Sequence, residues 1–272
     1  MTFTSDYFRG AQKIIMDLLQ EVRPEILRYH GKVEFETKSD KSIVTHLDKE
    51  LELKLKDVLS AYDSKVGFWG EEHGKEGSAK SYWLIDPIDG TEALVRGLPG
   101  VRNILTFIDN DQPVYALAYR LTTDDLFIAE RGMPTTKNGK VVKLSDRPLH
   151  RSWLEFSVNM RLPAGYVMYQ KLRPRVAGIT VHRDFLEILE GSLEGLVVYK
   201  SPGKEWDYAP RALMIEGAGG AAANIGSDHY DFHNTDLLAT SPVVFDEVHK
   251  LLSEAVKEVA PELAKQAQDN AS

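Results

Sequence analysis

Apolar side chains recur at helical spacing near the start of the chain, at positions 8, 11, 15, 18, 19 and 22. This spacing predicts an amphipathic helix over residues 5–29, with one apolar face for packing. Pro24 lies inside this segment, where it should kink or restart the helix. The chain is therefore expected to begin with a long helix.

A second leucine-rich segment permits two interpretations. Leu51, Leu53 and Leu55 alternate with polar residues, as they would in a half-buried strand. Leu51 and Leu55 also share one face of a helix, and Asp48 is a good N-cap ahead of them. The length of the segment favours the helix, which we predict over residues 48–61.

From residue 82 to residue 130 the pattern changes to short apolar runs separated by turn-forming clusters. The runs are YWLID, NILTFI, PVYALAY and DLFIAE. Short connections imply antiparallel pairing, so this region predicts an antiparallel sheet. After about residue 145, expected helices at 185–193, 207–216 and 245–259 alternate with expected strands at 195–200 and 237–240.

These elements predict two domains. We place the boundary near residues 145–148, between an N-terminal α+β domain (1–146) and a C-terminal α/β domain (147–272). The expected fold class is α+β, a layered αβαβα sandwich with an antiparallel N-terminal sheet and a smaller α/β C-terminal half. A chain of 272 residues can bury a sufficient core without a disulfide or a structural metal.

The amino-acid composition excludes several classes of protein function. The chain has no cysteine, which excludes a disulfide scaffold, a thiolate metal site and a cysteine nucleophile. Its formal net charge of −8 makes nucleic acids and membrane surfaces poor partners, although a local basic pocket can still bind an anion. No run of 18 apolar residues is present and the N-terminal segment does not resemble a signal peptide, so a cytoplasmic location is predicted.

Three acidic clusters stand out, namely GEEHG at 70–74, WLIDPIDGTE at 83–92 and KEWDYAP at 204–210. In the second, an apolar strand leads directly into Asp86 and Asp89. Gly90 permits a sharp turn, and Thr91 can cap a following helix whose free N–H groups attract an anion. Carboxylates repel an anion unless a divalent cation such as Mg²⁺ bridges the two. The alternative is a strand that ends in an Asp-Gly turn before a capped helix.

The other two clusters favour the metal site. Glu71 follows an apolar run, as Asp86 does, which places both residues at the ends of neighbouring strands. Asp207 precedes a helical pattern, which places a further carboxylate at a helix N-terminus. The neighbouring Trp206 is expected to pack in the core behind the site.

The ordered set GEE, DPIDGT and WDxA resembles the inositol monophosphatase superfamily of Mg²⁺-dependent, lithium-sensitive phosphatases. The residues VT at 44–45, followed by Asp48, are similar to the family's VTxxD element. The residues NG at 138–139, followed by Val142, are similar to its NGxxI/V segment. Members of this superfamily include fructose-1,6-bisphosphatases, histidinol-phosphate phosphatases and 3′(2′),5′-bisphosphate nucleotidases, and the resemblance covers essentially the whole chain.

The resemblance implies two or three bound Mg²⁺ ions. A first ion would bind Glu71, Asp86 and the carbonyl oxygen of Ile88. A second would bind Asp86, Asp89 and Asp207, and a loosely held third would use Glu71 and water. Two cations would neutralise a phosphate ester and stabilise the departing alkoxide.

The resemblance also implies roles in catalysis. Thr91, paired with Asp48, would orient the attacking water and help to deprotonate it, and Glu71 is the third predicted catalytic residue. The backbone N–H groups of Gly90 and Thr91 would bind the phosphate. Attack would be in line, without a phosphoenzyme, and Glu72 is expected to be a solvated or supporting carboxylate.

The predicted substrate pocket departs from the family's pattern. When the chain is aligned from Asp207, Arg183 and Lys200 stand where inositol-type members have a small residue and an acid. The two basic residues favour a substrate with a second anionic group, bound together with Asp89 and Asp207. In the alternative interpretation they form ion pairs with nearby acidic residues and do not contact substrate; the candidates are Asp184, Glu187 and Glu205.

The sequence thus predicts a Mg²⁺-dependent phosphomonoesterase that hydrolyses a small polyol or sugar phosphate and has no nucleic-acid or membrane partner. The first alternative is a bisphosphatase of the 3′(2′),5′-bisphosphate nucleotidase or fructose-1,6-bisphosphatase type. The second is a catalytically silent homologue that binds inositol phosphates or a protein partner. The family resemblance also implies a homodimer.

Overall fold

A computed structural model describes residues 3–181 and 184–269, with side chains as far as residue 261. The chain divides into two compact units, Met1–Val141 and Val142–Ser272, so that the division falls ahead of the segment 145–148. Both units combine helices with a sheet, which confirms the expected α+β class. Among the described residues, no helix has the length and apolar character needed to cross a bilayer.

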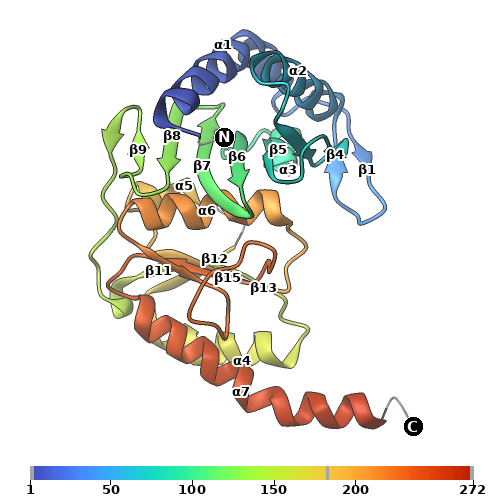
Figure 1. Ribbon diagram of the computed structural model, residues 1–272. Helices are drawn as coiled ribbons and strands as arrows, with labels where there is room; N and C mark the ends of the chain where they lie inside the picture. Colours follow the sequence, from blue (N-terminus) through green and yellow to red (C-terminus); the bar gives the residue numbers. More distant parts are fainter. Residues whose placement is uncertain (1–2, 182–183, 270–272) are drawn as a thin grey trace. The chain divides into compact units, whose positions relative to one another are not determined.

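The first unit is built on an eight-stranded sheet in the order β10-β9-β8-β7-β6-β5-β3-β4, with a separate hairpin of β1 and β2. Its helices are α1 (Ser5–Tyr29), α2 (His46–Tyr62) and α3 (Thr91–Arg96). Its strands are β1 (Glu36–Thr37), β2 (Ile43–Val44), β3 (Gly67–Gly70), β4 (Gly74–Glu76), β5 (Ser81–Asp89), β6 (Arg102–Asp109), β7 (Gln112–Arg120), β8 (Asp125–Glu130), β9 (Thr136–Lys137) and β10 (Lys140–Val141). Helices α1 and α2 lie together over one face of this sheet (Figure 1).

Helix α1 confirms the predicted segment, and its apolar stripe is buried from Phe8 to Ile26. The helix continues through Pro24 and does not restart there. Helix α2 confirms the helical interpretation of the second segment, because Leu51 and Leu55 are buried whereas Leu53 is 45% exposed. Alternation along a strand would have placed all three leucines on one face.

The predicted N-cap of α2 was wrong. The N-cap is Thr45, whose hydroxyl oxygen accepts a hydrogen bond from the backbone N–H of Leu47. Asp48 lies three residues inside, and its carboxylate accepts a bond from the Thr45 N–H at 2.9 Å in a capping box. This arrangement places the Asp48 carboxylate at the start of a rigid helix.

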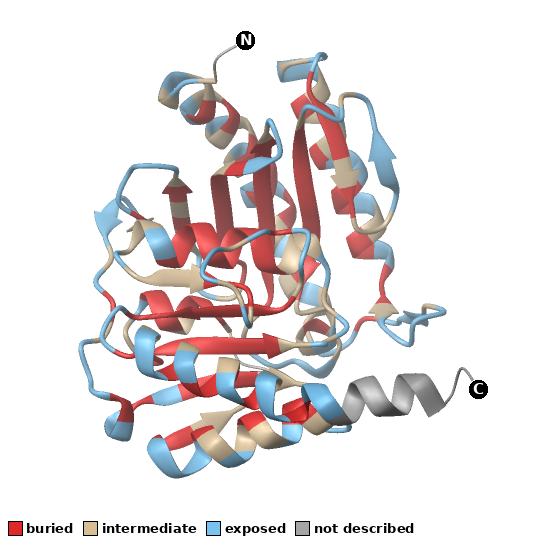
Figure 2. Ribbon diagram, turned by 60° about the horizontal axis from the view of Figure 1, so that its bottom comes forward, coloured by how far each residue is buried: buried red, intermediate tan, exposed pale blue. Residues whose placement is uncertain are grey.

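The pairs β5–β6, β6–β7 and β7–β8 are antiparallel, as predicted, although β5 and β6 are joined through α3 and not by a short turn. The sheet is not antiparallel throughout, because β3 pairs parallel with β5, with Gly70 opposite Ile85. The chain passes through β4 between these two strands, so it has room to return in the same direction. Burial is concentrated in the strands and on one side of the helices (Figure 2).

The second unit has a five-stranded mixed sheet in the order β12-β11-β13-β15-β14. Its strands are β11 (Trp153–Val158), β12 (Gly178–Thr180), β13 (Gly195–Tyr199), β14 (Ala221–Ala223) and β15 (Leu237–Thr240). Its α-helices are α4 (Pro163–Leu172), α5 (Leu186–Leu189), α6 (Glu205–Gly217) and α7 (Phe245–Asp269), with single 3₁₀ turns at Leu149–Arg151 and Arg173–Arg175. Figure 1 shows α4 and α7 on one face of this sheet and α5 and α6 on the other. The helix expected over 185–193 is shorter than predicted, because α5 contains only four residues.

Replacing Leu55 with alanine tests the packing of α2 against the sheet. Leu55 is fully buried, so Leu55→Ala should lower the free energy of unfolding by about 2–5 kcal/mol. Leu53→Ala, on the exposed side of the same helix, should change it by less than about 0.5 kcal/mol. Urea unfolding followed by tryptophan fluorescence measures both effects, and equal losses would contradict the observed orientation of α2.

Candidate active site

A β-bulge brings Asp86 and Asp89 together. Two residues three positions apart in a regular strand face opposite sides of the sheet. In β5, however, Asp86 pairs with Ile104 and Asp89 with Arg102, so that two residues of β5 lie opposite the single residue Asn103. Such a bulge re-aims the side chains that follow it. Carboxylate oxygens of Asp86 and Asp89 therefore lie within 4.8 Å of one another.

Asn103 holds the bulge in shape from the neighbouring strand. Its side chain is fully buried, and Nδ2 donates to the carbonyl oxygens of Asp86 and Pro87 at 3.3 and 3.0 Å. The bulge leaves these carbonyls without regular ladder partners, so the Asn103 amide satisfies them.

The parallel pairing of β3 with β5 places Glu71 beside Asp86. The backbone N–H of Glu71 donates to the carbonyl oxygen of Ile85 at 3.1 Å. Glu71 directly follows β3, as predicted, whereas Asp86 lies inside β5 and not at its end, next to the Ile85 that pairs with Gly70. The first unit therefore assembles Glu71, Asp86 and Asp89 at one end of its sheet.

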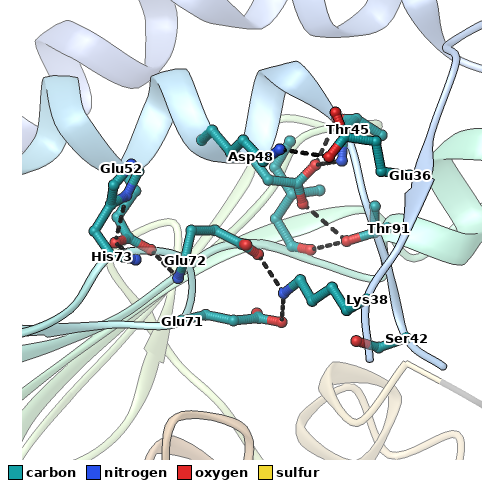
Figure 3. Close-up of polar contacts among 12 residues, drawn as sticks. Glu36, Lys38, Ser42, Thr45, Asp48, Glu52, Glu71, Glu72, His73 and Thr91 are labelled. Atoms are coloured by element: carbon teal, nitrogen blue, oxygen red, sulfur yellow. Dashed lines mark hydrogen bonds and ion pairs between the residues drawn. The ribbon is translucent and has the colours of Figure 1, made fainter. Parts of the chain in front are cut away.

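Lys38 lies between two carboxylates of this group (Figure 3). Its Nζ is 2.9 Å from Glu71 Oε1 and 2.7 Å from Glu72 Oε1. Burial alone would lower the pKa of Lys38, but the two carboxylates outweigh this effect and raise it. Burial raises the pKa of Glu72, and the Lys38 ammonium opposes the shift. Of the two expectations for Glu72, a solvated or a supporting carboxylate, the structure agrees with the second, because its side chain is only 6% exposed and pairs with Lys38.

Thr91 and Asp48 form the predicted pair (Figure 3). Thr91 Oγ1 lies 2.9 Å from Asp48 Oδ1 and 3.0 Å from the carbonyl oxygen of Ile88. A hydroxyl has one proton, so it donates to one of these two acceptors at a time. Burial raises the pKa of Asp48, although hydrogen bonds from Thr45 and Thr91 oppose the shift.

The expectation that Thr91 caps the following helix was wrong. Gly90 is the N-cap residue of α3, in the left-handed region at φ 93°, and Thr91 is the first helical residue. A side chain at Gly90 would also place its Cβ 2.6 Å from the carbonyl oxygen of Gly100. Glycine therefore permits both the turn and the close approach, and the Thr91 hydroxyl is available to Asp48.

Arg102 contacts Asp89 from the next strand. Its Nε and Nη2 lie 2.7 and 2.6 Å from Asp89 Oδ2, and Nη1 donates to the carbonyl oxygen of Gly100 at 2.8 Å. Both side chains are almost completely buried, with 6% of Arg102 and 10% of Asp89 exposed. Asp89 thus has a permanent positive charge beside it.

Glu52 supports the turn that carries Glu71. From α2, its carboxylate accepts hydrogen bonds from the backbone N–H groups of Glu72 and His73, each at 2.8 Å, and lies 2.9 Å from His73 Nδ1. The side chain is 5% exposed and packs against Gly70. This carboxylate replaces the backbone partners that the turn would otherwise lack.

The second unit contains the remaining predicted residues. Asp207 lies in the first turn of α6, where Oδ2 accepts a bond from the Lys204 N–H at 2.6 Å. Trp206 is half-buried rather than a full core residue. Lys200 Nζ pairs with Asp236 Oδ2 at 2.8 Å, and this contact raises the pKa of Lys200. Arg183 lies outside the described residues.

The donors of the first unit are of the kind that a hard divalent cation takes. Asp86 and Asp89 offer carboxylate oxygens within 4.8 Å of one another, and Glu71 follows the strand that pairs with β5. Mg²⁺ prefers such oxygen ligands. Lys38 already places a positive charge at Glu71, as expected where carboxylates gather. At Asp89 the fit is incomplete, because Arg102 occupies Oδ2.

The sequence pattern did not reveal four residues that shape the site, namely Lys38, Glu52, Arg102 and Asn103. Each lies on an element other than the motif it supports, so spacing within the motif carries no sign of it. A signal was present for Arg102 and Asn103, since they interrupt the start of an otherwise apolar strand. A polar pair in a buried strand requires partners there.

A Gly70→Ala variant tests the support that Glu52 gives. A Cβ at Gly70 would lie 2.1 Å from Glu52 Oε1 and would displace the carboxylate from the turn. We expect a loss of about 1–3 kcal/mol in unfolding free energy and faster hydrogen exchange at the Glu72 and His73 amides. In a Glu52→Ala background the same change should cost clearly less. Equal costs in both backgrounds would argue against the contact.

Comparisons with known proteins identify the family of the chain. Residues 4–260 match the Inositol monophosphatase family. A fructose-1,6-bisphosphatase/inositol-1-monophosphatase of Aquifex aeolicus is 26% identical over 233 residues, which cover 79% of this chain and 85% of that protein. A putative Nus factor SuhB of Neisseria meningitidis is 24% identical over 232 residues, which cover 81% of this chain and 88% of that protein.

Solved structures share the fold. The inositol monophosphatase TM1415 of Thermotoga maritima has a TM-score of 0.80 at 22% identity, with 93% of this chain and 99% of that chain covered. An IMPase/NADP phosphatase in complex with Mg²⁺ and phosphate has a TM-score of 0.75 at 20% identity, with 89% and 95% covered. Together with the family match over nearly the whole chain, these findings show that the protein belongs to the inositol monophosphatase family, a family of phosphoric monoester hydrolases.

Proposed function

We propose that this protein is a Mg²⁺-dependent phosphomonoesterase acting on a small polyol or sugar phosphate. The observation that carries the proposal is the convergence of Glu71, Asp86 and Asp89 at a bulged strand end, next to the Thr91–Asp48 pair. The carboxylates would hold the cation, and the Thr91–Asp48 pair would accept a proton from the attacking water. A phosphatase needs both groups in one place.

Glu71, Asp86 and the carbonyl of Ile88 would hold the ion. When bound, Mg²⁺ supplies positive charge that offsets the phosphate dianion and makes a nearby water molecule more acidic. From the second unit, Asp207 is proposed to contribute a further carboxylate. The second ion expected at Asp86, Asp89 and Asp207 would share Asp89 with Arg102.

The Thr91–Asp48 pair is proposed to activate the attacking water. When Thr91 donates its proton to Asp48, its oxygen lone pairs are left to accept a hydrogen bond from water. Asp48 is fixed by the capping box of α2, so it can hold the hydroxyl in one orientation. The backbone N–H groups of Gly90 and Thr91 would orient the phosphate for in-line attack.

The substrate contacts are proposed from the sequence. Asp89 and Asp207 are proposed to contact the leaving group, together with Arg183 and Lys200 if the substrate carries a second anionic group. The Lys200–Asp236 pair supports the opposing interpretation, in which Lys200 is held in place by an acidic neighbour. If Arg183 and Lys200 do contact the substrate, the alternative to a simple polyol or sugar phosphate is a bisphosphate or NADP-like substrate, hydrolysed by the same reaction.

Three further features belong to the proposal. Lithium sensitivity and a homodimer are proposed from the family resemblance, and a cytoplasmic location is proposed from the sequence. The name of the Neisseria relative, a putative Nus factor, favours one second candidate function, that of a homologue which binds a protein partner. The Thr91–Asp48 pair argues against a purely binding role, because binding requires no activated hydroxyl.

A phosphate-release screen tests the proposed reaction. The panel contains inositol-1-phosphate, fructose-1,6-bisphosphate, adenosine 3′,5′-bisphosphate, NADP and histidinol phosphate, each with and without Mg²⁺ and Li⁺. We expect release from at least one compound that requires Mg²⁺ and is inhibited by Li⁺. Asp86→Asn should abolish this phosphate release. Asp17→Asn, on the exposed face of α1, should leave it unchanged. No release from any compound with Mg²⁺ would refute the proposal.

The Thr91 hydroxyl should carry a large share of the rate. Thr91→Ala removes the contact with Asp48 and is expected to lower kcat on the order of 100-fold to 10,000-fold. Thr91→Ser retains the hydroxyl and should keep most of the activity. Steady-state kinetics compare the two variants, and similar losses would show that the methyl group, rather than the hydroxyl, matters.

The raised pKa of Asp48 predicts the acid limb of the pH profile. Asp48 accepts the Thr91 proton only when ionised, so kcat/KM should fall as the pH drops through this pKa. Because burial raises the pKa, the fall should begin above the ordinary aspartate value of about 3.9. An Asp48→Asn variant should lose this limb along with most of its activity. The same limb in that variant would assign it to another group.

A further inference from the structure

We propose that Arg102 takes the place of one metal ion at Asp89, so that the site binds one divalent cation fewer than its carboxylates suggest. This inference rests on the proposed function, because it concerns the ions of the same site. It arises from a single contact, the buried ion pair between Arg102 and Asp89.

The ion pair occupies one of the two carboxylate oxygens of Asp89, namely Oδ2. Arg102 presents Nε and Nη2 to Asp89 Oδ2 at 2.7 and 2.6 Å. Short contacts of this kind are charge-assisted hydrogen bonds, which are about twice as strong as neutral ones. Asp89 therefore has its negative charge matched by a side chain of the chain itself.

Arg102 cannot easily give up this position. The guanidinium stays charged at every physiological pH, and a buried charge requires a partner. Its Nη1 is also anchored to the carbonyl of Gly100 at 2.8 Å. Arg102 is the first residue of β6 and lies directly opposite Asp89, next to the Asn103 that holds the bulge.

A divalent cation at Asp89 would lie close to this fixed positive charge. Like charges repel more strongly in a buried site than in water, so a second ion would bind weakly there. The ammonium of Lys38, which pairs with Glu71, is more accessible to solvent than the Arg102 guanidinium, with 22% against 6% of the side chain exposed, so water and salt screen its charge better. One ion is thus expected to bind firmly, at Glu71 and Asp86.

Equilibrium dialysis with Mn²⁺, read by electron paramagnetic resonance, counts the ions without reference to activity. We expect the intact protein to bind one Mn²⁺ per chain tightly. Arg102→Gln removes the charge and should create a second site whose affinity is at least tenfold higher than any second site of the parent. Arg102→Lys keeps the charge and should retain the parent stoichiometry.

A double variant keeps the test valid if Arg102→Gln does not fold. Arg102→Gln leaves the Asp89 carboxylate buried beside an uncharged neighbour. The double variant Asp89→Asn, Arg102→Gln removes both charges. This double variant should bind one ion, as the parent does. Circular dichroism melting establishes that each variant is folded before its ions are counted.

The outcomes separate the two proposals. Two tight Mn²⁺ sites in the parent protein, or no gain of a site in folded Arg102→Gln, would overturn the role of Arg102 and leave the phosphatase proposal standing. A parent protein with no tight Mn²⁺ site and no Mg²⁺-dependent phosphate release would overturn both. One site in the parent and two in Arg102→Gln is the result that the ion pair predicts.

Discussion

Carboxylates that are removed from water must be matched by positive charge or by hydrogen-bond donors, and this constraint shapes the first unit. Six carboxylates lie in the first two turns of α2, just after β3 and in β5; they belong to Asp48, Glu52, Glu71, Glu72, Asp86 and Asp89. Backbone N–H groups stabilise Asp48 and Glu52, Lys38 bridges the two glutamates, and Arg102 binds Asp89. Burial without such partners would neutralise these groups by raising their pKa values. Such a gathering of carboxylates is the kind of donor set that a hard cation takes, which is why we propose a cation there.

Rigid elements determine where each of these groups points. The capping box fixes Asp48, the parallel pairing of β3 with β5 fixes Glu71, and the bulge fixes Asp86 relative to Asp89. Sites built on helices and strands are more accurately placed than sites built on loops. Inositol monophosphatase family membership gives this arrangement its chemical meaning, since the family hydrolyses phosphate esters.

Much of this arrangement was predictable from the sequence, because local patterns encode local structure. The bounds of α1 follow from periodicity, and the neighbouring strands that carry Glu71 and Asp86 follow from two apolar runs that lead into acids. The bulge was not predictable, because it depends on Asn103 from another strand. The capping roles of Asp48 and Thr91 were predicted wrongly, since Thr45 and Gly90 are the N-cap residues. Charged residues such as Lys38 look the same in a sequence whether they face solvent or a carboxylate.

The central claim is that the edge formed by Glu71 and Asp86 binds a divalent cation. Crystals grown with Mn²⁺ and measured at its absorption edge test this directly, because anomalous scattering locates the ion independently of any activity. We expect a peak within about 2.5 Å of an Asp86 carboxylate oxygen and near Glu71. Saturating Mn²⁺ with no anomalous peak at these residues would contradict it.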